Sequence, residues 1–445
     1  MEAKEAPPRS YASGGDRISA LPDGVRDLVL SFLPAHEAVR TAVVARSWRD
    51  LWTRSPALRI TRWGSIEKFN KFVERLLRLH CSAPVSGRYP CSDPRAAPAR
   101  LDSCHFDFIT PDFVGEIESM TIYEKLANYW FHCALQCQVR VLQYCFSRIG
   151  NPLELLDMTL VSGHLTKLEL AGVSTGSNIN LSGCPVLQDL KMEDCYLHLE
   201  EIQSPYLQHL RMASCCFLLR HRTLIRLPSI ISLELTQCSG RAPFLDSMPS
   251  LATAIVTFDS DNWYDGCSLS SIDVCDSDDC EGCDYYYSDP NTDRTNCLLL
   301  NGLSEATDLE LSAYPETVVF RRDLKFARTF CKLKTLVLAD WFVADDLSAL
   351  IWFLHHSPVL EKLTLHISKV HENAMTAEQS CKLPERSVAS SHLKIVEIKC
   401  HQVDGIVIEI FKILTAHGVP SEQINIKCST GSGYVNFKCT GFSTK

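Results

Sequence analysis

The chain has 445 residues, of which 46% are hydrophobic and 22% are charged, and its formal net charge is −9. This composition is typical of globular proteins and excludes a wholly disordered or collagen-like chain. No apolar run approaches the roughly 18 residues of a membrane-spanning helix, and the polar first 17 residues lack the apolar core of a secretory signal. We therefore expect no membrane partner and a reducing compartment, cytoplasm or nucleus, in which the 21 cysteines remain thiols.

The negative charge is concentrated in one segment. Residues 259–296 contain eleven acids and one base, a net charge of −10, which leaves the rest of the chain at +1. No basic stripe remains elsewhere, so the sequence predicts no nucleic-acid partner. The length and polarity of the segment predict a disordered insertion.

Residues 16–60 are predicted to form a small helical block, after a disordered N-terminus at 1–15. Apolar residues follow Pro22 at the spacing of one helical face: Val25, Leu28, Val29, Phe32 and Leu33. Two shorter helices are predicted at 38–43 and 48–52. A three-helix block of this length has too small a core to be stable alone, so we expect it to pack against a neighbour or a partner.

The next segment, residues 61–100, is predicted to be a helix followed by a linker. Residues 65–80 are amphipathic, with apolar side chains at helical spacing. Four prolines then fall within residues 81–100, which is typical of a loop.

The body of the chain, residues 101–382, repeats the pattern apolar-x-x-apolar-x-apolar. Clear copies, one of them beyond this range, begin at Leu165, Leu187, Leu207, Ile230, Leu333, Leu360 and Leu393. The intervals between copies are 20–23 residues at first and 27–33 after residue 306. A proline stands two residues before several copies, where it ends the preceding segment because it cannot continue a helix.

A cysteine recurs at a fixed distance after this pattern in three copies. Cys195, Cys215 and Cys238 each lie five residues after the central leucine of a copy. Together these signals form the leucine-rich repeat pattern, in which each repeat is a strand and a return segment. Because one repeat cannot cover its own apolar face, the repeats must stack into an α/β solenoid. We expect each cysteine to be a small buried group where the chain turns away from the strand.

Residues 383–442 differ from the repeats. The pattern predicts a strand at 393–398, a helix at 406–414 and a second strand from Ile424. Such a strand-helix-strand segment can close the open end of a solenoid as a C-terminal cap. The predicted fold class is therefore α+β, with an N-terminal three-helix block, the α/β repeats and this cap.

The motifs that carry enzyme chemistry are absent. The sequence has no glycine-rich phosphate loop and no nucleophile elbow. Cys280 and Cys283 have zinc-ligand spacing, but a second such pair is missing. The segment from Asp276 begins like a calcium loop, but Glu281 replaces the required glycine. We therefore predict no catalytic residue, no cofactor and no metal.

Three segments resemble the plant F-box domain. They are DRISALPD at 16–23, LVLSFLP at 28–34 and AVRTAVVARSWR at 38–49, followed by Leu51 and Trp52. Ala45 departs from the family, which often has serine or cysteine there. The order of the segments resembles plant proteins that combine an F-box, leucine-rich repeats and an FBD, and residues 383–442 look like the FBD.

This resemblance implies a substrate-recognition subunit of an SCF-type ubiquitin ligase. In that family the F-box docks on a Skp-type adaptor, the adaptor links to a cullin scaffold, and the repeats bind a protein substrate for ubiquitination. The residues expected to form or support the adaptor interface are Leu21, Pro22, Leu28, Leu30, Val39, Val43 and Trp48.

Two alternatives stay open. These seven residues can instead hold the three-helix block together, because apolar helix positions are more often core than interface. The whole chain can instead be a leucine-rich repeat scaffold that acts outside a ubiquitin ligase. The substrate itself is not readable, since no single repeat carries an obvious charged or aromatic stripe.

Overall fold

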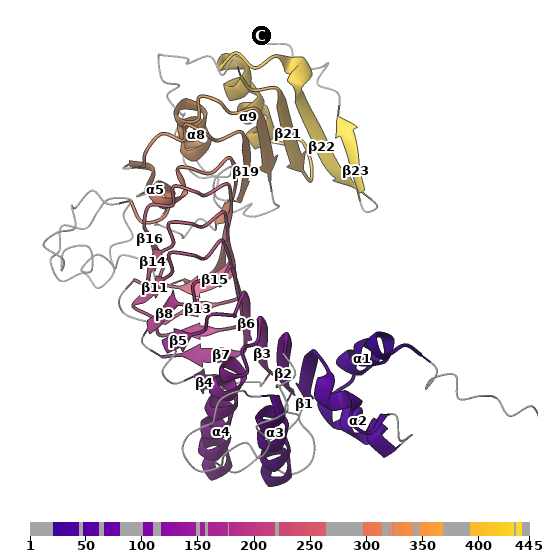
Figure 1. The fold of residues 1–445 in the computed structure, drawn as a ribbon. Coiled ribbons are helices and arrows are strands. Elements are labelled where there is room, and N and C mark those ends of the chain that lie inside the picture. The colour runs from indigo at the N-terminus through magenta and orange to yellow at the C-terminus, as the bar shows by residue number, and fades with distance from the viewer. Residues whose placement is uncertain are drawn as a thin grey trace, which may run out of the picture. The chain divides into compact units, whose positions relative to one another are not determined.

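The computed structural model (Figure 1) describes residues 21–43, 48–61, 66–80, 101–109, 117–147, 152–155, 159–176, 178–218, 222–263, 297–313, 320, 323–325, 327–340, 347–367, 392–430 and 433–437. The chain divides into two compact units. The first comprises Met1–Thr110 and Lys125–Tyr144, and the second comprises Pro111–Glu124 and Cys145–Lys445. The segments predicted to be disordered, 1–15 and nearly all of the acidic insertion, lie outside the described residues, as does the linker at 81–100.

The first unit begins with short helical elements: α1 (Asp23–Phe32), α2 (Ala35–Arg40) and the 3₁₀ turns η1 (Thr41–Val43) and η3 (Leu51–Arg54). Prolines 22 and 34 occupy the N-cap positions of α1 and α2, and no side chain caps either helix. A proline suits this boundary because its fixed φ favours the extended backbone that precedes a helix. Leu30, Ala38, Trp48 and Leu51 form a small buried core among these elements.

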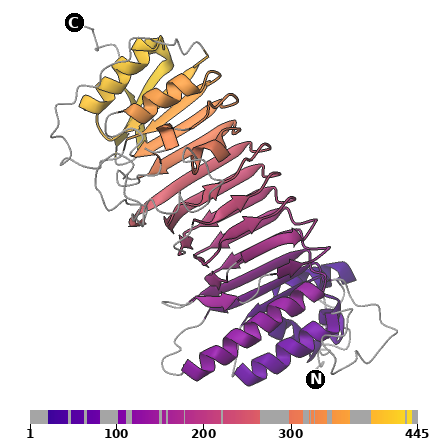
Figure 2. The same ribbon diagram turned by 90° about the vertical axis from the view of Figure 1, so that its left-hand side faces the viewer.

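The remainder of the first unit is a sheet with two long helices. β1 (Ala57–Thr61) pairs in parallel with β2 (Ser103–Ile109), which pairs with β3 (Val141–Ser147). α3 (Ile66–His80) is the helix predicted at 65–80, and it lies beside α4 (Ile117–Gln136) (Figures 1 and 2). Their core is aromatic: the rings of Phe69 and Trp130 are 5.3 Å apart, edge to face, which is a favoured aromatic geometry.

The second unit contains a large sheet of parallel strands. In order these are β6 (Lys167–Ala171), β9 (Asp189–Glu193), β12 (His209–Ala213), β15 (Ser232–Gly240), β17 (Thr253–Trp263), β18 (Asp308–Ala313), β19 (Thr335–Asp340), β20 (Lys362–His366), β21 (Ile395–Cys400) and β22 (Ile424–Thr430). One antiparallel strand, β23 (Gly433–Phe437), follows at the edge.

The register of these strands follows the sequence pattern. The central leucines of successive copies are partners, as in Leu168 with Leu190 and Leu190 with Leu210. The same holds later in the array, where Leu336 pairs with Leu363. The clear copies of the pattern thus fall on parallel strands that pair in register with their neighbours. These leucines are buried on one face of the sheet, so apolar burial sets the register, because a slip of one residue would expose them all.

The return segments change along the array. In the early copies they form a second parallel sheet of short strands: β5 (Thr159–Val161), β8 (Asn178–Gly183), β11 (Glu201–Gln203), β14 (Leu224–Arg226) and β16 (Phe244–Leu245). In the later copies they carry helices: α5 (Leu300–Leu303), α8 (Ser348–His356) and α9 (Gly405–Ala416), seen in Figure 2. A strand advances about 3.3 Å per residue and a helix only about 1.5 Å. A helical return therefore needs a longer interval, as in the 27 residues from Leu333 to Leu360, between which α8 lies.

The C-terminal prediction holds at the level of elements. The strand, helix and strand expected from residue 393 onward are β21, α9 and β22. Asp404 caps α9 by accepting a hydrogen bond from the amide of Val407 at 3.1 Å, as expected for an N-cap aspartate. The predicted domain boundaries remain predictions, and β2, from the expected repeat region, belongs to the first unit.

Each early copy makes a sharp corner after its strand, where four short strands form a further parallel ladder: β4 (Leu153–Leu155), β7 (Val173–Thr175), β10 (Tyr196–Leu197) and β13 (Cys216–Phe217). Four residues past each central leucine, the backbone is left-handed. Gly172, Asp194, Ser214 and Gln237 have φ of 64°, 51°, 52° and 53°. Only the first of these four corners has a glycine at the left-handed position, so residue type does not reveal the corners in the sequence.

The predicted cysteines occupy the next position and are buried, as expected. The thiol of Cys195 donates to the carbonyl oxygens of Leu170, in the preceding copy, at 3.6 Å and of Glu193 at 3.3 Å. Cys238 donates in the same way to Met212 at 3.6 Å. The thiols thus give partners to carbonyls at a corner where the strand ladder ends.

A buried carboxylate anchors the chain just after the acidic insertion. Asp323 is fully buried and accepts hydrogen bonds from the amides of Leu298, Leu299 and Leu300 at 2.8, 2.7 and 2.9 Å. Burial raises the pKa of this carboxyl group, while the three N–H donors act in the opposite direction. Asp323 thereby holds the start of α5 in place.

The first corner gives a stability prediction. A Cβ atom on Gly172 would stand 1.7 Å from the carbonyl oxygen of Phe146, and the backbone φ is +64°. Gly172→Ala should lower the free energy of unfolding by more than about 2 kcal/mol. Gly163→Ala is the matched control, because no atom lies within 4 Å of its added Cβ. Equal urea midpoints for the two variants would contradict this account of the corner.

The corner thiol of Cys238 should be chemically inert in the folded protein. Burial raises the pKa of Cys238 to about 12, so almost none of it is thiolate at pH 8, and thiolate is the reactive form. Iodoacetamide should label the exposed Cys331 in the native protein and label Cys238 only after guanidinium unfolding. Mass spectrometry of tryptic peptides measures both rates, and similar native rates would refute the prediction.

Candidate functional site

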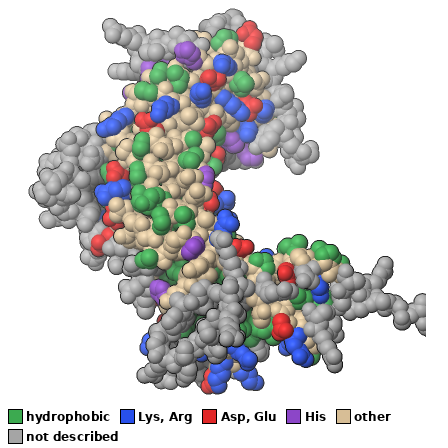
Figure 3. Space-filling model, viewed as in Figure 1, with side chains coloured by type: hydrophobic (Ala, Val, Ile, Leu, Met, Phe, Trp, Pro, Cys, Tyr) green, Lys and Arg blue, Asp and Glu red, His purple; other side chains and the backbone are tan. Residues whose placement is uncertain are grey.

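Helix α1 presents an uncovered apolar face. Val25, Leu28, Val29 and Phe32 keep 42%, 55%, 42% and 65% of their surface exposed. They recur at the spacing of one helical side, and hydrophobic side chains gather over this element in Figure 3. We call these four residues the α1 apolar face. A contiguous exposed patch of this kind marks an interaction site in a soluble protein.

The seven predicted interface residues divide into two groups. Pro22, Leu28 and Val43 are exposed, Val43 at 87%, and Leu21 and Val39 are half-buried. These five are accessible to a partner.

The other two predicted residues are internal. Leu30 is 1% exposed and Trp48 is 5% exposed, and both belong to the core that includes Ala38 and Leu51. They support the surface from within. Sequence reasoning chose neither Val25, Val29 nor Phe32, although all three were part of the predicted helical face. The sequence does not show which side of α1 packs against the small core and which side stays exposed.

The parallel sheet of the second unit offers a second surface. Apart from the buried Thr364 of β20, the residues that alternate with the buried leucines along β6 to β22 are exposed or half-buried, because successive side chains of a strand point to opposite faces. We call this the open face of the sheet. The return segments cover the other side.

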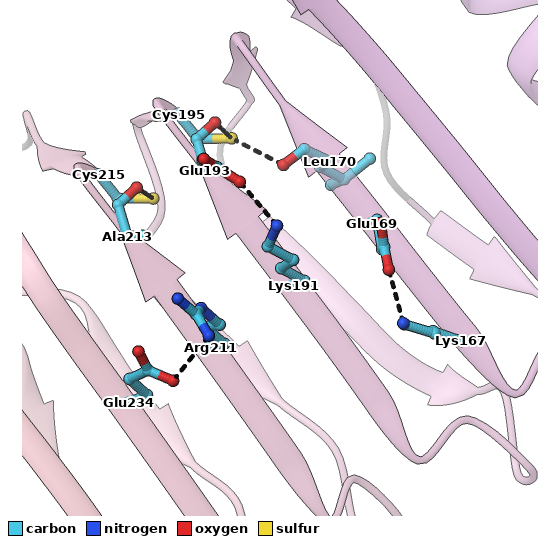
Figure 4. A network of polar contacts seen from close by, with 10 residues as sticks. All are labelled: Lys167, Glu169, Leu170, Lys191, Glu193, Cys195, Arg211, Ala213, Cys215 and Glu234. Atoms are coloured by element: carbon cyan, nitrogen blue, oxygen red, sulfur yellow. Dashed lines mark hydrogen bonds and ion pairs between the residues drawn. The ribbon is translucent and has the colours of Figure 1, made fainter. Parts of the chain in front are cut away.

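At the β6–β15 end, the open face carries a ladder of charges (Figure 4). Lys167 contacts Glu169 at 2.6 Å, Lys191 contacts Glu193 at 2.7 Å, and Arg211 contacts Glu234 at 3.4 Å. The sequence shows no obvious charged stripe within a single repeat, and no prediction was made about a stripe across the array. The stripe arises from register, which places charges of different repeats side by side. Its charges compensate one another, so it is close to neutral.

At the β20–β22 end, bases predominate on the open face. Glu397 accepts a hydrogen bond from Lys427 at 2.9 Å, and this bond, with Lys362 and Lys399 nearby, lowers the pKa of Glu397. Glu361 accepts from Lys394 at 2.7 Å, which lowers the pKa of that carboxyl group as well. Both carboxylates are held ionised by an excess of neighbouring lysines.

The described residues give no support to a metal centre. Among them, no three His, Cys, Asp or Glu side chains gather as metal ligands would. Cys280 and Cys283, the weak zinc signal, lie outside the described ranges, as does the calcium-like segment from Asp276. No helix in the described part of the chain is long and apolar enough to cross a membrane.

Comparison with known families defines the class of the first unit's helical elements. Residues 18–59 match the F-box domain, which covers α1, α2, the 3₁₀ turns and part of β1. The chain thus carries an F-box domain at residues 18–59, together with a mixed α/β structure that contains a large parallel sheet.

Three of the relatives are plant proteins whose names include the F-box. The chain is 26% identical over 427 residues to the rice (Oryza sativa subsp. japonica) protein named MEIOTIC F-BOX protein MOF, covering 86% of this chain and 80% of the relative. It is 27% identical over 226 residues to an Arabidopsis thaliana F-box/FBD/LRR-repeat protein, covering 47% and 48%. An Arabidopsis F-box/LRR-repeat protein is 40% identical over 83 residues, covering 16% and 17%. The chain thus spans less than half the length of these two Arabidopsis relatives, and the resemblance to plant F-box, LRR and FBD proteins is confirmed.

The two leucines of α1 provide a test of core against surface. Leu30→Ala should destabilise the first unit by about 3 kcal/mol, because it empties a buried core position. Leu28→Ala changes the same residue type in the same helix at 55% exposure, and should cost under about 0.5 kcal/mol. Hydrogen exchange of the α1 amides in both variants measures the difference, and equal protection would contradict the division.

Proposed function

We propose that this protein is the substrate-recognition subunit of an SCF-type ubiquitin ligase. F-box proteins in general act in this way, with the F-box bound to a Skp-type adaptor that links to a cullin scaffold. The presence of an F-box at residues 18–59 supports this role. In this proposal the F-box docks the adaptor and the sheet of the second unit binds a protein substrate.

The observation that carries the proposal is the α1 apolar face. An F-box whose first helix leaves Leu28 and Phe32 more than half exposed is suited to pack that helix against another apolar surface. Covering the four side chains of the face contributes about 4 kcal/mol before the costs of association. Leu21, Pro22, Val39 and Val43 extend the contact in this proposal, while Leu30 and Trp48 support it from the core.

The proposed receptor surface is the open face of the sheet. We take the stacked copies to be leucine-rich repeats that form a solenoid, with β21, α9 and β22 as an FBD-like cap. The strand pairing in register and the buried cysteines at the corners support this assignment. A rigid row of parallel strands offers side chains at fixed spacing, which suits the recognition of an extended protein surface.

The proposed mechanism is proximity. Holding the substrate and the ubiquitin carrier on one scaffold raises the effective concentration of the acceptor lysine. No residue of this chain takes part in bond chemistry in the proposal, and it needs neither cofactor nor metal. The proposed compartment is the cytoplasm, the nucleus or both.

The second candidate function is a repeat-based binding scaffold outside a ubiquitin ligase. The open face of the second unit favours this candidate, because that face can bind a partner whether or not the F-box binds an adaptor. The two candidates differ in one measurable property, which is binding to a Skp-type adaptor.

The test is co-purification of the full chain with a plant Skp-type adaptor. The double variant Leu28→Asp, Phe32→Asp should reduce adaptor binding more than about 100-fold, because two carboxylates would be buried in the apolar contact. Val161→Asp is the control, since Val161 is an exposed valine of the second unit, 71% accessible, and should leave adaptor binding unchanged.

Two outcomes would overturn parts of this proposal. A wild-type chain that binds no Skp-type adaptor would refute the ligase role and leave the scaffold. A double variant that binds as tightly as the wild type would show that the α1 apolar face is not the adaptor contact.

A further inference from the structure

A row of bases crosses the C-terminal end of the open face. His366 on β20 is the register partner of Lys399 on β21, and Lys399 is the register partner of Lys427 on β22. The Nζ atom of Lys399 lies 3.4 Å from Nε2 of His366. Adjacent strands are about 4.8 Å apart, so three basic side chains stand within about 10 Å of one another.

The Lys399–Lys427 pair in this row is unfavourable for the sheet itself, whereas Nε2 of a neutral His366 can accept a hydrogen bond from Lys399. Like charges directly opposite each other on neighbouring strands are destabilising. Elsewhere on the same face the charges are compensated: Lys167 and Lys191 each have a glutamate on their own strand. Among the residues that the structure describes, Glu397 is a carboxylate in contact with the base row, and it pairs with Lys427.

The excess of bases extends beyond the row. The lysines around Glu397 are Lys362, Lys399 and Lys427, and Glu361 is near Lys394 and Lys334. Five lysines and two glutamates leave a local charge of +3, with the histidines counted as neutral. We call Lys362, Lys399, Lys427 and His366 the basic cluster.

The strand beside the basic cluster is uncharged on the same face. Thr335 and Val337 of β19 are half-buried, and Thr364 of β20, the register partner of Glu397, is only 4% exposed. Thr364 is therefore closed to a partner, and the short side chains of Thr335 and Val337 stand next to the longer lysines. An extended peptide can approach the sheet closely there while its acidic side chains reach the lysines.

We propose that the basic cluster on β20–β22 binds an acidic, Asp- and Glu-rich segment of a protein partner. Charge complementarity selects the occupant, because the excess of lysines around Glu397 and the uncharged Thr335 and Val337 of β19 favour carboxylates over basic or apolar segments. The chain as a whole carries −9 and repels acidic ligands at long range, so such binding is a property of this cluster. The segment would be the substrate class of the proposed receptor, and in that respect the inference rests on the proposed function.

The experiment measures binding of a fluorescent 12-residue peptide of alternating Glu and Ser to the purified full chain. The variant is Lys362→Gln with Lys399→Gln, which removes two charges and keeps the ion pair of Glu397 with Lys427. We expect about fivefold weaker binding than for the wild type, since exposed ion pairs contribute about 0.2–1 kcal/mol each. Binding should also weaken as salt is raised, because the contacts are solvent-exposed.

The matched control is Lys167→Gln with Lys191→Gln, an equal charge change on the same face at β6 and β9. This control should bind the peptide within about twofold of the wild type, because its lysines are more than a Debye length from the cluster. Thermal melting of both double variants checks that the sheet is intact. A peptide with Gln in place of Glu should not bind.

Three results would overturn the inference. These are no binding of the acidic peptide by the wild type, equal weakening in both double variants, or tighter binding of a single-stranded oligonucleotide than of the peptide at the same site. None of them depends on the adaptor. Peptide binding without adaptor binding would refute the proposed ligase role alone, and adaptor binding without peptide binding would refute this inference alone.

Discussion

The second unit depends on one constraint, the in-register stacking of a central apolar residue from each copy of the pattern on that of the next. Leu168, Leu190 and Leu210 show it in the early copies and Leu336 with Leu363 in the later ones. Burial of these side chains fixes which face of every strand is covered. The remaining positions then face outward in rows, so the constraint that builds the core also creates the surface proposed to bind a partner.

Much of this architecture could be predicted from the sequence, because apolar periodicity reports burial directly. The strands, the buried cysteines and the final strand-helix-strand were all accessible in this way. The corners were not. Asp194, Ser214 and Gln237 adopt a left-handed backbone that local residue type does not demand, and the tertiary fold imposes it at a fixed distance from each leucine.

The candidate sites were predictable to different degrees. The helical face of α1 could be seen in the sequence, yet only the packing of Leu30 and Trp48 against Ala38 separates core from surface. The charge ladder and the basic cluster could not be seen at all. Their contacts between strands join distant residues, such as Arg211 with Glu234 and Glu397 with Lys427, and the proximity of these residues exists only once the register is known.

The carboxylate of Asp323 has a consequence for how the chain can change over time. It accepts hydrogen bonds from the main chain at Leu298–Leu300, which lies more than 20 residues before it and directly after the acidic insertion. Before the insertion, β17 pairs with β15 and β18. Both ends of the acidic insertion are therefore tied down independently of what lies between them. A longer, shorter or different sequence there, even a reporter domain, would leave the pairing of β17 and the hydrogen bonds of Asp323 in place. We therefore expect the fold to tolerate sequence changes in this stretch better than in the strands.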